Sequence, residues 1–495
     1  MAPSCRGDDN TGSKKEQEDS NSGNGNENSG NEEDKEKQGP PTPVGFWDSR
    51  LNAVRKEAFT KWGITTVVLM TSIMALLSIY WAVFFHVEAN MSSLVVYVVD
   101  FDGQVAPYDN TGVQPIVGPT IVELANKMVA SSKPTLGFGS MPPLAFKNDP
   151  LEVRRAVYNF EAWAAIIIMP NATSLLYSAI QNGNASYDPM GACQLVYVQA
   201  RDETNWSNYL GPTLMQFETE ATSMVGKMWA KTALQLASSN QTVLQSMSQV
   251  PQALSPAIGF STYNLRPFYP QTSTPAVSIG LIYLIIIAFF SFSFYFPIHF
   301  KYLKPEGHPP LKFWQLVIWR WCATMAAYFF LSLAYSLISL AFQINFTGGV
   351  PGTGDPTAVT PIEFGNPASY GRGTFIVYWM LNWVGMMALG LACENVAMIV
   401  GQPWVALWLI FWVITNVSTS FYDIDISPHF YYWGYAWPLH QIVEGSRQIL
   451  FDLHSRLGLN FGILFAWAAV NTAVFPAACY FMRWKSKNGV HEYYR

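Results

Sequence analysis

The chain has 495 residues, of which 50% are hydrophobic and only 13% are charged. Soluble domains average about 25% charged residues, so this composition excludes an ordinary soluble protein and indicates a membrane protein. The net charge of −5 provides no basic surface, and we expect no nucleic-acid partner.

The first 46 residues are acidic and nearly free of apolar side chains. They hold ten acidic and five basic residues, which accounts for the whole net charge. Such a segment cannot bury enough surface to offset its chain entropy, so we predict a disordered cytosolic tail at 1–46. No apolar run directly follows Met1, and we expect no cleavable signal peptide.

Six apolar segments have the composition of membrane spans. The first, 63–86, follows four basic residues between positions 50 and 61, which places its N-terminal end in the cytosol by the positive-inside rule. The other five fall within 276–482, and the tail at 483–495 is then cytosolic as well. They are 276–300, 321–342, 373–393, a short one at 403–418, and 461–482.

Ionisable residues are scarce in these spans. None lies in the middle of a span, which weighs against a proton-coupled or ion-coupled transporter, because such proteins carry buried charges. Arg320 and Glu394 fall at the inner edges of two spans. They could form an ion pair, but we favour charged ends that snorkel to the membrane surface.

The segment 87–275 is long enough for a folded domain of its own. Strands are predicted at 94–101, 163–170 and 193–200, and the second is fully apolar and therefore central. Helices are predicted at 115–132, at 171–183 with Asn171 or Thr173 as N-cap, and as one or two amphipathic helices within 205–249. We predict an α+β extracellular domain without disulfides, because Cys193 is its only cysteine.

Glycosylation acceptors of the form Asn-x-Ser/Thr test this topology, since only lumenal acceptors are modified. Seven occur, and all fall in segments predicted to be outside or at the outer membrane edge. They are Asn90, Asn171, Asn184, Asn205, Asn240, Asn345 and Asn416.

The stretch "VVDFDGQ" raises the possibility of phosphatase chemistry. Phosphatases of the haloacid-dehalogenase type use two aspartates with the spacing of Asp100 and Asp102, followed by Thr or Val where this chain has Gln104. No matching lysine or second acidic pair is evident in 105–275. We favour a strand that ends in an Asp-Gly turn.

The last external loop, 423–460, combines aromatic and charged residues. Its Trp and Tyr residues at 433–437 suit the membrane headgroup belt. His440, Glu444 and Arg447 fall on one helical face, which could bind a ligand, but two zinc-type ligands are too few for a metal site. We favour a short helix at the outer surface, and no metal or cofactor is expected.

The order of these parts resembles the fungal nitrosoguanidine-resistance family over about residues 47–485. The segments "VVYVVDFDG", "AIIIMPNATSLL" and "YWGYAWPLHQIVEGSRQILFD" carry the resemblance. More distantly, the layout is similar to phage-infection-type proteins and to the membrane halves of six-span ABC exporters. The resemblance implies a plasma-membrane or other secretory-pathway protein linked to drug or mutagen resistance.

We therefore expect an α-helical polytopic membrane protein with six transmembrane helices and an α+β extracellular domain inserted between the first two. Its expected function is resistance through export or exclusion of amphipathic compounds; the alternative is a non-transporting organiser of lipid asymmetry or protein traffic. We expect no enzyme. A P-loop motif is absent from the sequence, so a pump would need a separate energy-supplying partner. Membrane lipids and amphipathic small molecules are the other expected partners.

Overall fold

The computed structural model describes residues 43–110, 112–239, 241–302, 307–309, 311–344, 346, 370–401 and 403–487. The chain divides into two compact units at residue 67, within the first long helix. The smaller unit, described from residue 43, contains a 3-10 turn at Ser49–Leu51 and the start of α1 (Asn52–Ala82). Most of the predicted tail 1–46 lies outside the described residues. Apart from the start of α1, every feature below belongs to the larger unit, 68–495.

Five helices are long and apolar enough to cross a membrane. α12 (Val405–Ser418) has 14 residues, about 21 Å by helical rise, so it falls short of the usual bilayer thickness. Five of the six predicted spans thus correspond to helices of sufficient length, and the remaining one, 403–418, stays a prediction. The five helices are α1, α9 (Ile282–Phe300), α10 (Phe313–Ala341), α11 (Thr374–Val400) and α14 (Leu457–Lys487).

Helix α11 forms the centre of the helices that follow residue 270. In its apolar window 72% of the residues are buried, against 28–39% in α9, α10 and α14. It packs on α13 (Pro438–Phe451) through glycines: a Cβ at Gly385 would lie 2.5 Å from Ile442 Cδ1, and one at Gly445 would lie 2.8 Å from Leu381 Cδ2. These glycines let the two helices approach closely.

A five-stranded mixed sheet lies between α1 and α9 in the sequence, in the order β2-β1-β3-β4-β5. β1 is parallel to β2 and β3, β3 is antiparallel to β4, and β4 is parallel to β5. We call residues 95–266, which include the two residues after β5, the sheet domain. Its strands are β1 (Val95–Asp100), β2 (Gly137–Met141), β3 (Ala164–Ile168), β4 (Cys193–Tyr197) and β5 (Phe260–Asn264).

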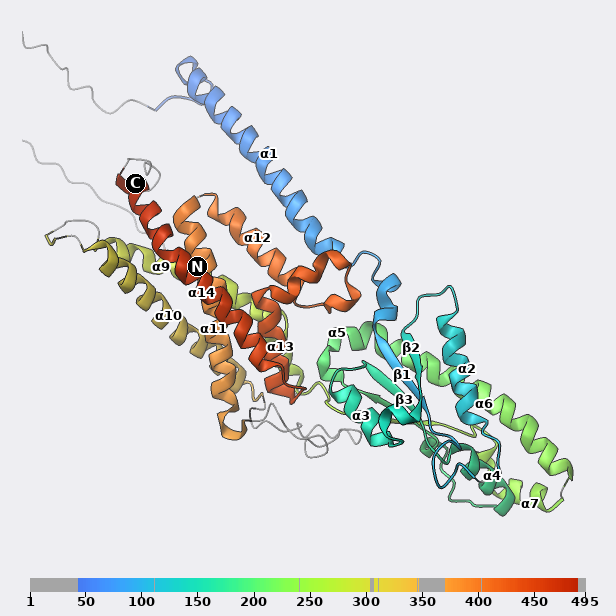
Figure 1. Cartoon of the computed structure of the whole chain (residues 1–495). Coiled ribbons are helices and arrows are strands. Elements are labelled where there is room, and N and C mark those ends of the chain that lie inside the picture. Colours follow the sequence, from blue (N-terminus) through green and yellow to red (C-terminus); the bar gives the residue numbers. More distant parts are fainter. Residues whose placement is uncertain are drawn as a thin grey trace, which may run out of the picture. The chain divides into compact units, whose positions relative to one another are not determined.

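The two faces of the sheet are buried by different partners. Val96 and Val98 of β1 pack into a core with α2, α4 and α6, whereas Val99 and Ile167 face α3. Figure 1 shows α2 and α3 on opposite sides of the labelled strands. The core on the α3 side continues into α9, α11 and α13. The helices of the domain are α2 (Val117–Val129), α3 (Pro150–Tyr158), α4 (Ala172–Asn182), α5 (Glu203–Asn205), α6 (Gly211–Ser239) and α7 (Gln241–Gln249).

The strands predicted from the sequence appear as β1, β3 and β4, and the fully apolar β3 is central and completely buried. Sequence patterns missed β2 and β5. The "GFGSM" of β2 lacks β-branched residues, and its Gly137 is required because a Cβ there would collide with the Ser92 carbonyl. The polar "FSTYN" of β5 carries little apolar signal.

The long loop 423–460 folds into α13 and two 3-10 turns, Ile424–Ile426 and His429–Ala436. The predicted surface helix is in fact an interior one, since nearly every residue of α13 is buried. It contacts α11, α12 and α14 as well as the segment Gln199–Arg201 of the sheet domain. The predicted cytosolic tail at 483–495 also begins as helix, because α14 continues to Lys487.

Candidate functional site

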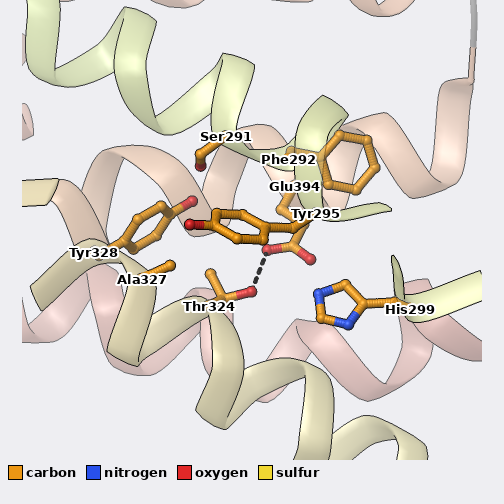
Figure 2. Close-up of a pocket in the computed structure, with 8 residues that line it drawn as sticks. All are labelled: Ser291, Phe292, Tyr295, His299, Thr324, Ala327, Tyr328 and Glu394. Carbon is orange, nitrogen blue, oxygen red and sulfur yellow. Dashed lines mark hydrogen bonds between the residues drawn. The ribbon is translucent and has the colours of Figure 1, made fainter. Parts of the chain in front are cut away.

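A buried ion pair joins two of the membrane-type helices. Arg320 Nη2 of α10 donates to Glu394 Oε1 of α11 at 2.6 Å, and the two side chains are only 1% and 3% exposed. Thr324, one helical turn beyond Arg320, donates from its hydroxyl to the other carboxylate oxygen at 3.2 Å, as Figure 2 shows. The preference for two snorkelling charges was therefore wrong.

The bounds of the helices explain this correction. α10 begins at Phe313 and α11 continues to Val400. The spans predicted from the sequence, 321–342 and 373–393, instead begin and end directly beside the two charges. Arg320 lies seven residues inside α10 and Glu394 six residues from the end of α11, which is about 10 Å along each axis. Opposite charges that satisfy each other do not have to end a helix.

The rest of the Arg320 guanidinium has weak partners. Nη1 contacts three sulfurs, Met398 Sδ at 3.0 Å, Cys479 Sγ at 3.7 Å and Met482 Sδ at 3.8 Å. Its Nε has no hydrogen-bond partner among the described residues. Sulfur is a poor acceptor compared with oxygen, so this cation is fully buried but incompletely satisfied.

A small cavity adjoins the pair. Its volume is about 10 Å³, which is room for about one water molecule. The lining includes Ser291, Tyr295 and His299 of α9 and Tyr328 of α10. Figure 2 shows the rings of Tyr295, His299 and Tyr328 on the sides of the Glu394 carboxylate. His299 Nδ1 is buried without a partner among the described residues, so a water in the cavity would have polar groups to bind.

Tyr328 reaches this cavity because α11 has a glycine opposite it. A Cβ at Gly390 would lie 2.5 Å from Tyr328 Cζ, inside any permissible contact. We call Ser291, Tyr295, His299, Arg320, Thr324, Tyr328 and Glu394 the polar cluster. Charged and polar groups that face one another inside a helical bundle are functional candidates by default, because burying them is expensive.

The polar residues predicted on α13 form a separate group. Arg447 Nη1 donates to Asp202 Oδ2 at 3.2 Å, to the Arg201 carbonyl at 3.1 Å and to Glu444 Oε1 at 3.3 Å. His440 Nδ1 instead lies 2.9 Å from the Thr419 carbonyl oxygen. Arg447 therefore connects α13 to the sheet domain, and its pKa is raised because burial, which lowers it, is outweighed by Asp202 and Glu444.

Sequence reasoning missed the second connection between α13 and the sheet domain. Arg266 Nη2 donates to Asp452 Oδ2 at 2.9 Å, and its Nε donates to the Asp452 carbonyl at 3.0 Å. The Tyr158 hydroxyl donates to that same carbonyl at 3.0 Å. Burial raises the pKa of Asp452 to about 6, although Arg266 opposes the rise. We call the Arg266–Asp452 and Arg447–Asp202 contacts the junction.

The aspartates of "VVDFDGQ" have structural partners. Asp102 accepts from Gly118 N at 3.2 Å, from Thr173 N at 2.9 Å and from the Thr173 hydroxyl at 2.5 Å. It thereby links the starts of α2 and α4 to the end of β1. Asp100 accepts from Asp102 N at 2.9 Å, and burial raises its pKa to about 6. The turn at Gly103 has φ +66°, as the favoured strand-end interpretation requires.

The glycosylation acceptors differ in accessibility. Asn184 is exposed, and Asn90 and Asn171 are half-buried, whereas Asn205 and Asn416 are completely buried, which disfavours a glycan at these two. Asn240 and Asn345 lie outside the described residues. Within the described ranges no group of three or more His, Cys, Asp or Glu residues is arranged to hold a metal ion.

Comparison with known proteins places the chain among membrane proteins. A family described as "Protein of unknown function (DUF3533)" matches residues 65–473. An uncharacterised endoplasmic reticulum membrane protein of Saccharomyces cerevisiae is 26% identical over 458 residues, covering 89% of this chain and 83% of the relative. No solved structure matches the chain.

Proposed function

Because the chain belongs to the DUF3533 family, whose function is open, we propose a function from the polar cluster. In this proposal the protein is a multi-pass membrane protein that confers resistance to drugs or mutagens such as nitrosoguanidine by exporting or excluding amphipathic compounds. One observation carries this proposal: the Arg320–Glu394 pair is buried between α10 and α11 beside a cavity with unpartnered polar atoms.

The pair acts as a closure between these helices. Each charge is stable in a low-polarity interior only while it faces the other, so the pair favours the closed arrangement. A shift of α9 or α10 that admits water would solvate both groups and expose a polar path between the helices. The cavity beside Thr324 and His299 is where such water would first enter. A separate energy-supplying partner remains part of the proposal.

The proposed location is a membrane of the secretory pathway, the plasma membrane included, with both termini in the cytosol. The relative from the endoplasmic reticulum supports the pathway, and the four basic residues between positions 50 and 61, at the start of α1, support the orientation. Membrane lipids are the surrounding partner. We propose no enzymatic role, because Asp102 already uses its carboxylate to hold Gly118 and Thr173.

Accumulation of a labelled amphipathic drug tests this function. Cells that lack the gene should accumulate more drug, and cells carrying Glu394→Gln should accumulate as much as the deletion while retaining the protein. Glu220→Gln is the matched control, because Glu220 is an exposed residue of α6 that pairs with Gln216 at 2.8 Å. Unchanged accumulation in the deletion strain would refute export and exclusion alike.

The alternative is a non-transporting organiser that affects lipid asymmetry or protein traffic. The close glycine packing of α11 on α13, at Gly385 and Gly445, favours it because such a contact leaves no room for a substrate. Reconstituted protein would then move neither drug nor labelled lipid, while deletion cells would show altered lipid exposure. Drug movement that requires Glu394 would exclude this alternative.

A further inference from the structure

We propose that a groove on the sheet domain binds an amphipathic organic cation. The groove has a volume of about 840 Å³ and lies between α6 and the segment 254–260 that leads into β5. Drug-sized ligands occupy clefts of roughly 300–1,000 Å³. This site goes beyond the proposed function, because binding here requires neither transport nor the polar cluster.

Side-chain hydrogen bonds hold the rim of the groove in place. Trp229 Nε1 of α6 donates to the Ala253 carbonyl at 2.7 Å, and the Tyr187 hydroxyl donates to the Ala257 carbonyl at 2.7 Å. Gln252 Nε2 donates to the Ala185 carbonyl at 2.9 Å. Ala257 has φ +66°, a conformation that these contacts maintain against its steric cost. A rim fixed in advance loses little entropy when a ligand binds.

A glycine on α6 leaves part of the groove wall open. Gly226 lies in the interior of this 29-residue helix, where glycine is less stable than alanine by about 1 kcal/mol. A Cβ at Gly226 would meet nothing nearer than the Pro256 carbonyl oxygen at 3.9 Å. Helix packing therefore does not require glycine here, and its effect is to leave space in the groove.

Glu218 gives the groove its charge preference. It lines the groove, and its Oε1 is buried without a hydrogen-bond partner among the described residues. Desolvation raises the pKa of this carboxyl, which a bound cation would reverse. Lys227 lines the groove nine residues further along α6, about 13.5 Å by helical rise, and so does not neutralise Glu218.

The rest of the lining is mostly apolar or uncharged. Met190, Leu254 and Pro256 offer an apolar surface to the body of a ligand, and Phe260, which is 5% exposed, lines the groove as well. Thioether and aromatic groups are well suited to cationic and aromatic ligands, because both are polarisable. A molecule with one positive charge and a bulky apolar body would thus meet Glu218 with its charge and these side chains with its body.

Calorimetric titration of the full chain in lipid nanodiscs tests the proposal with two probes of the same shape. Tetraphenylphosphonium is the cation and tetraphenylborate the matched anion, and empty nanodiscs correct for partition into lipid. We expect saturable binding of the cation and none of the anion. Glu218→Gln should weaken cation binding about tenfold or more, because the Coulomb attraction between the carboxylate and the phosphonium is lost, while the exposed neighbour Glu220→Gln should leave it unchanged.

Two glycine variants locate the binding. Gly226→Leu should abolish it by filling the wall, and Gly226→Ala, which has room for its Cβ, should keep the fold and reduce affinity. An unchanged unfolding temperature for Glu218→Gln and Gly226→Ala shows that the fold is intact. Absence of saturable cation binding, equal affinity in Glu218→Gln, or anion binding that Lys227→Met removes would each overturn the proposal.

Discussion

Three arginine–carboxylate pairs are buried among the described residues, and two of them, Arg266–Asp452 and Arg320–Glu394, have different surroundings. Arg266 and Asp452 at the junction are 0% and 1% exposed, and Arg320 and Glu394 in the polar cluster are 1% and 3% exposed. Around Arg266 the further acceptors are carbonyl oxygens, those of Leu265 and Asp452. Around Arg320 they are sulfurs, and an empty space lies nearby.

This difference indicates that the Arg266–Asp452 pair has a structural role, whereas the surroundings of the Arg320–Glu394 pair can rearrange. A buried charge whose hydrogen bonds are satisfied by oxygen has no better arrangement, so the junction holds the sheet domain on α13. A buried charge with weak acceptors is stabilised when water or a ligand reaches it. Arg320 Nε and His299 Nδ1, which have no hydrogen-bond partner among the described residues, could bind such a molecule. At the junction, Asp452 Oδ1 has no hydrogen-bond partner among the described residues, so the contact is strong but not complete.

Replacement of Arg266 at the junction should have the largest effect on the stability of the fold. Arg266→Met leaves the Asp452 carboxylate buried without its cation, which destabilises proteins by about 3–5 kcal/mol. The unfolding temperature in detergent should fall sharply and the yield of folded protein should drop. The Asp452→Asn change in the same chain should restore much of the loss, because the uncompensated charge is gone. Equal instability of the single and double variants would show that Arg266 acts through packing alone.

Added bulk at the polar cluster should have a smaller effect. Gly390→Ala places a methyl group 2.5 Å from Tyr328 Cζ, on a buried ring that cannot turn away, and overpacking of this kind destabilises by about 1–3 kcal/mol. Gly462→Ala in α14 is the control, since a Cβ there would meet no atom within 4 Å. Thermal unfolding should show the larger loss for Gly390→Ala. The reverse order would contradict the tight seating of Tyr328.

Titration of Asp452 at the junction should have a weaker effect on the stability of the fold. The pKa of Asp452 is raised to about 6 from 3.8, so its contribution to stability is complete below about pH 4 and is lost as the pH rises through 6. The stability difference between Asp452→Asn and the unaltered protein should therefore shift in favour of the variant as the pH rises from about 4 to about 6. The exposed Asp109→Asn is the control. A constant difference across this range of pH would contradict the raised pKa.

Local patterns in the sequence predicted much of this molecule. Apolar β-branched runs identified β1, β3 and β4, and apolar length identified five long helices. They could not predict β2, whose Gly137 allows a close approach to the Ser92 carbonyl. The favoured interpretation of "VVDFDGQ" as a strand end agrees with the position of Asp102, which accepts hydrogen bonds from the starts of α2 and α4.

The candidate site was predicted in part. Glu394 and Arg447 were singled out from the sequence, but their partners were not established, since pairing depends on which helices meet. Arg320 and Glu394 are 74 residues apart, and Arg266 and Asp452 are 186 apart. A charge at the edge of an apolar run indicates the end of a span until its partner is found. Only the packing of α10 on α11 shows that both charges lie inside.

Glycosylation should produce the smallest change and decides on which side of the membrane the junction lies. The sheet domain carries Asn184, which is exposed, and Asn205, which is completely buried. If the domain faces the lumen, Asn184→Gln should remove one glycan and increase electrophoretic mobility, without a change in unfolding temperature. Asn205→Gln should leave the mobility unchanged, because a folded chain has no room for a glycan there. A protein whose mobility never responds to glycosidase would contradict the lumenal placement of the sheet domain, and with it the assignment of the polar cluster to the cytosolic end of α10.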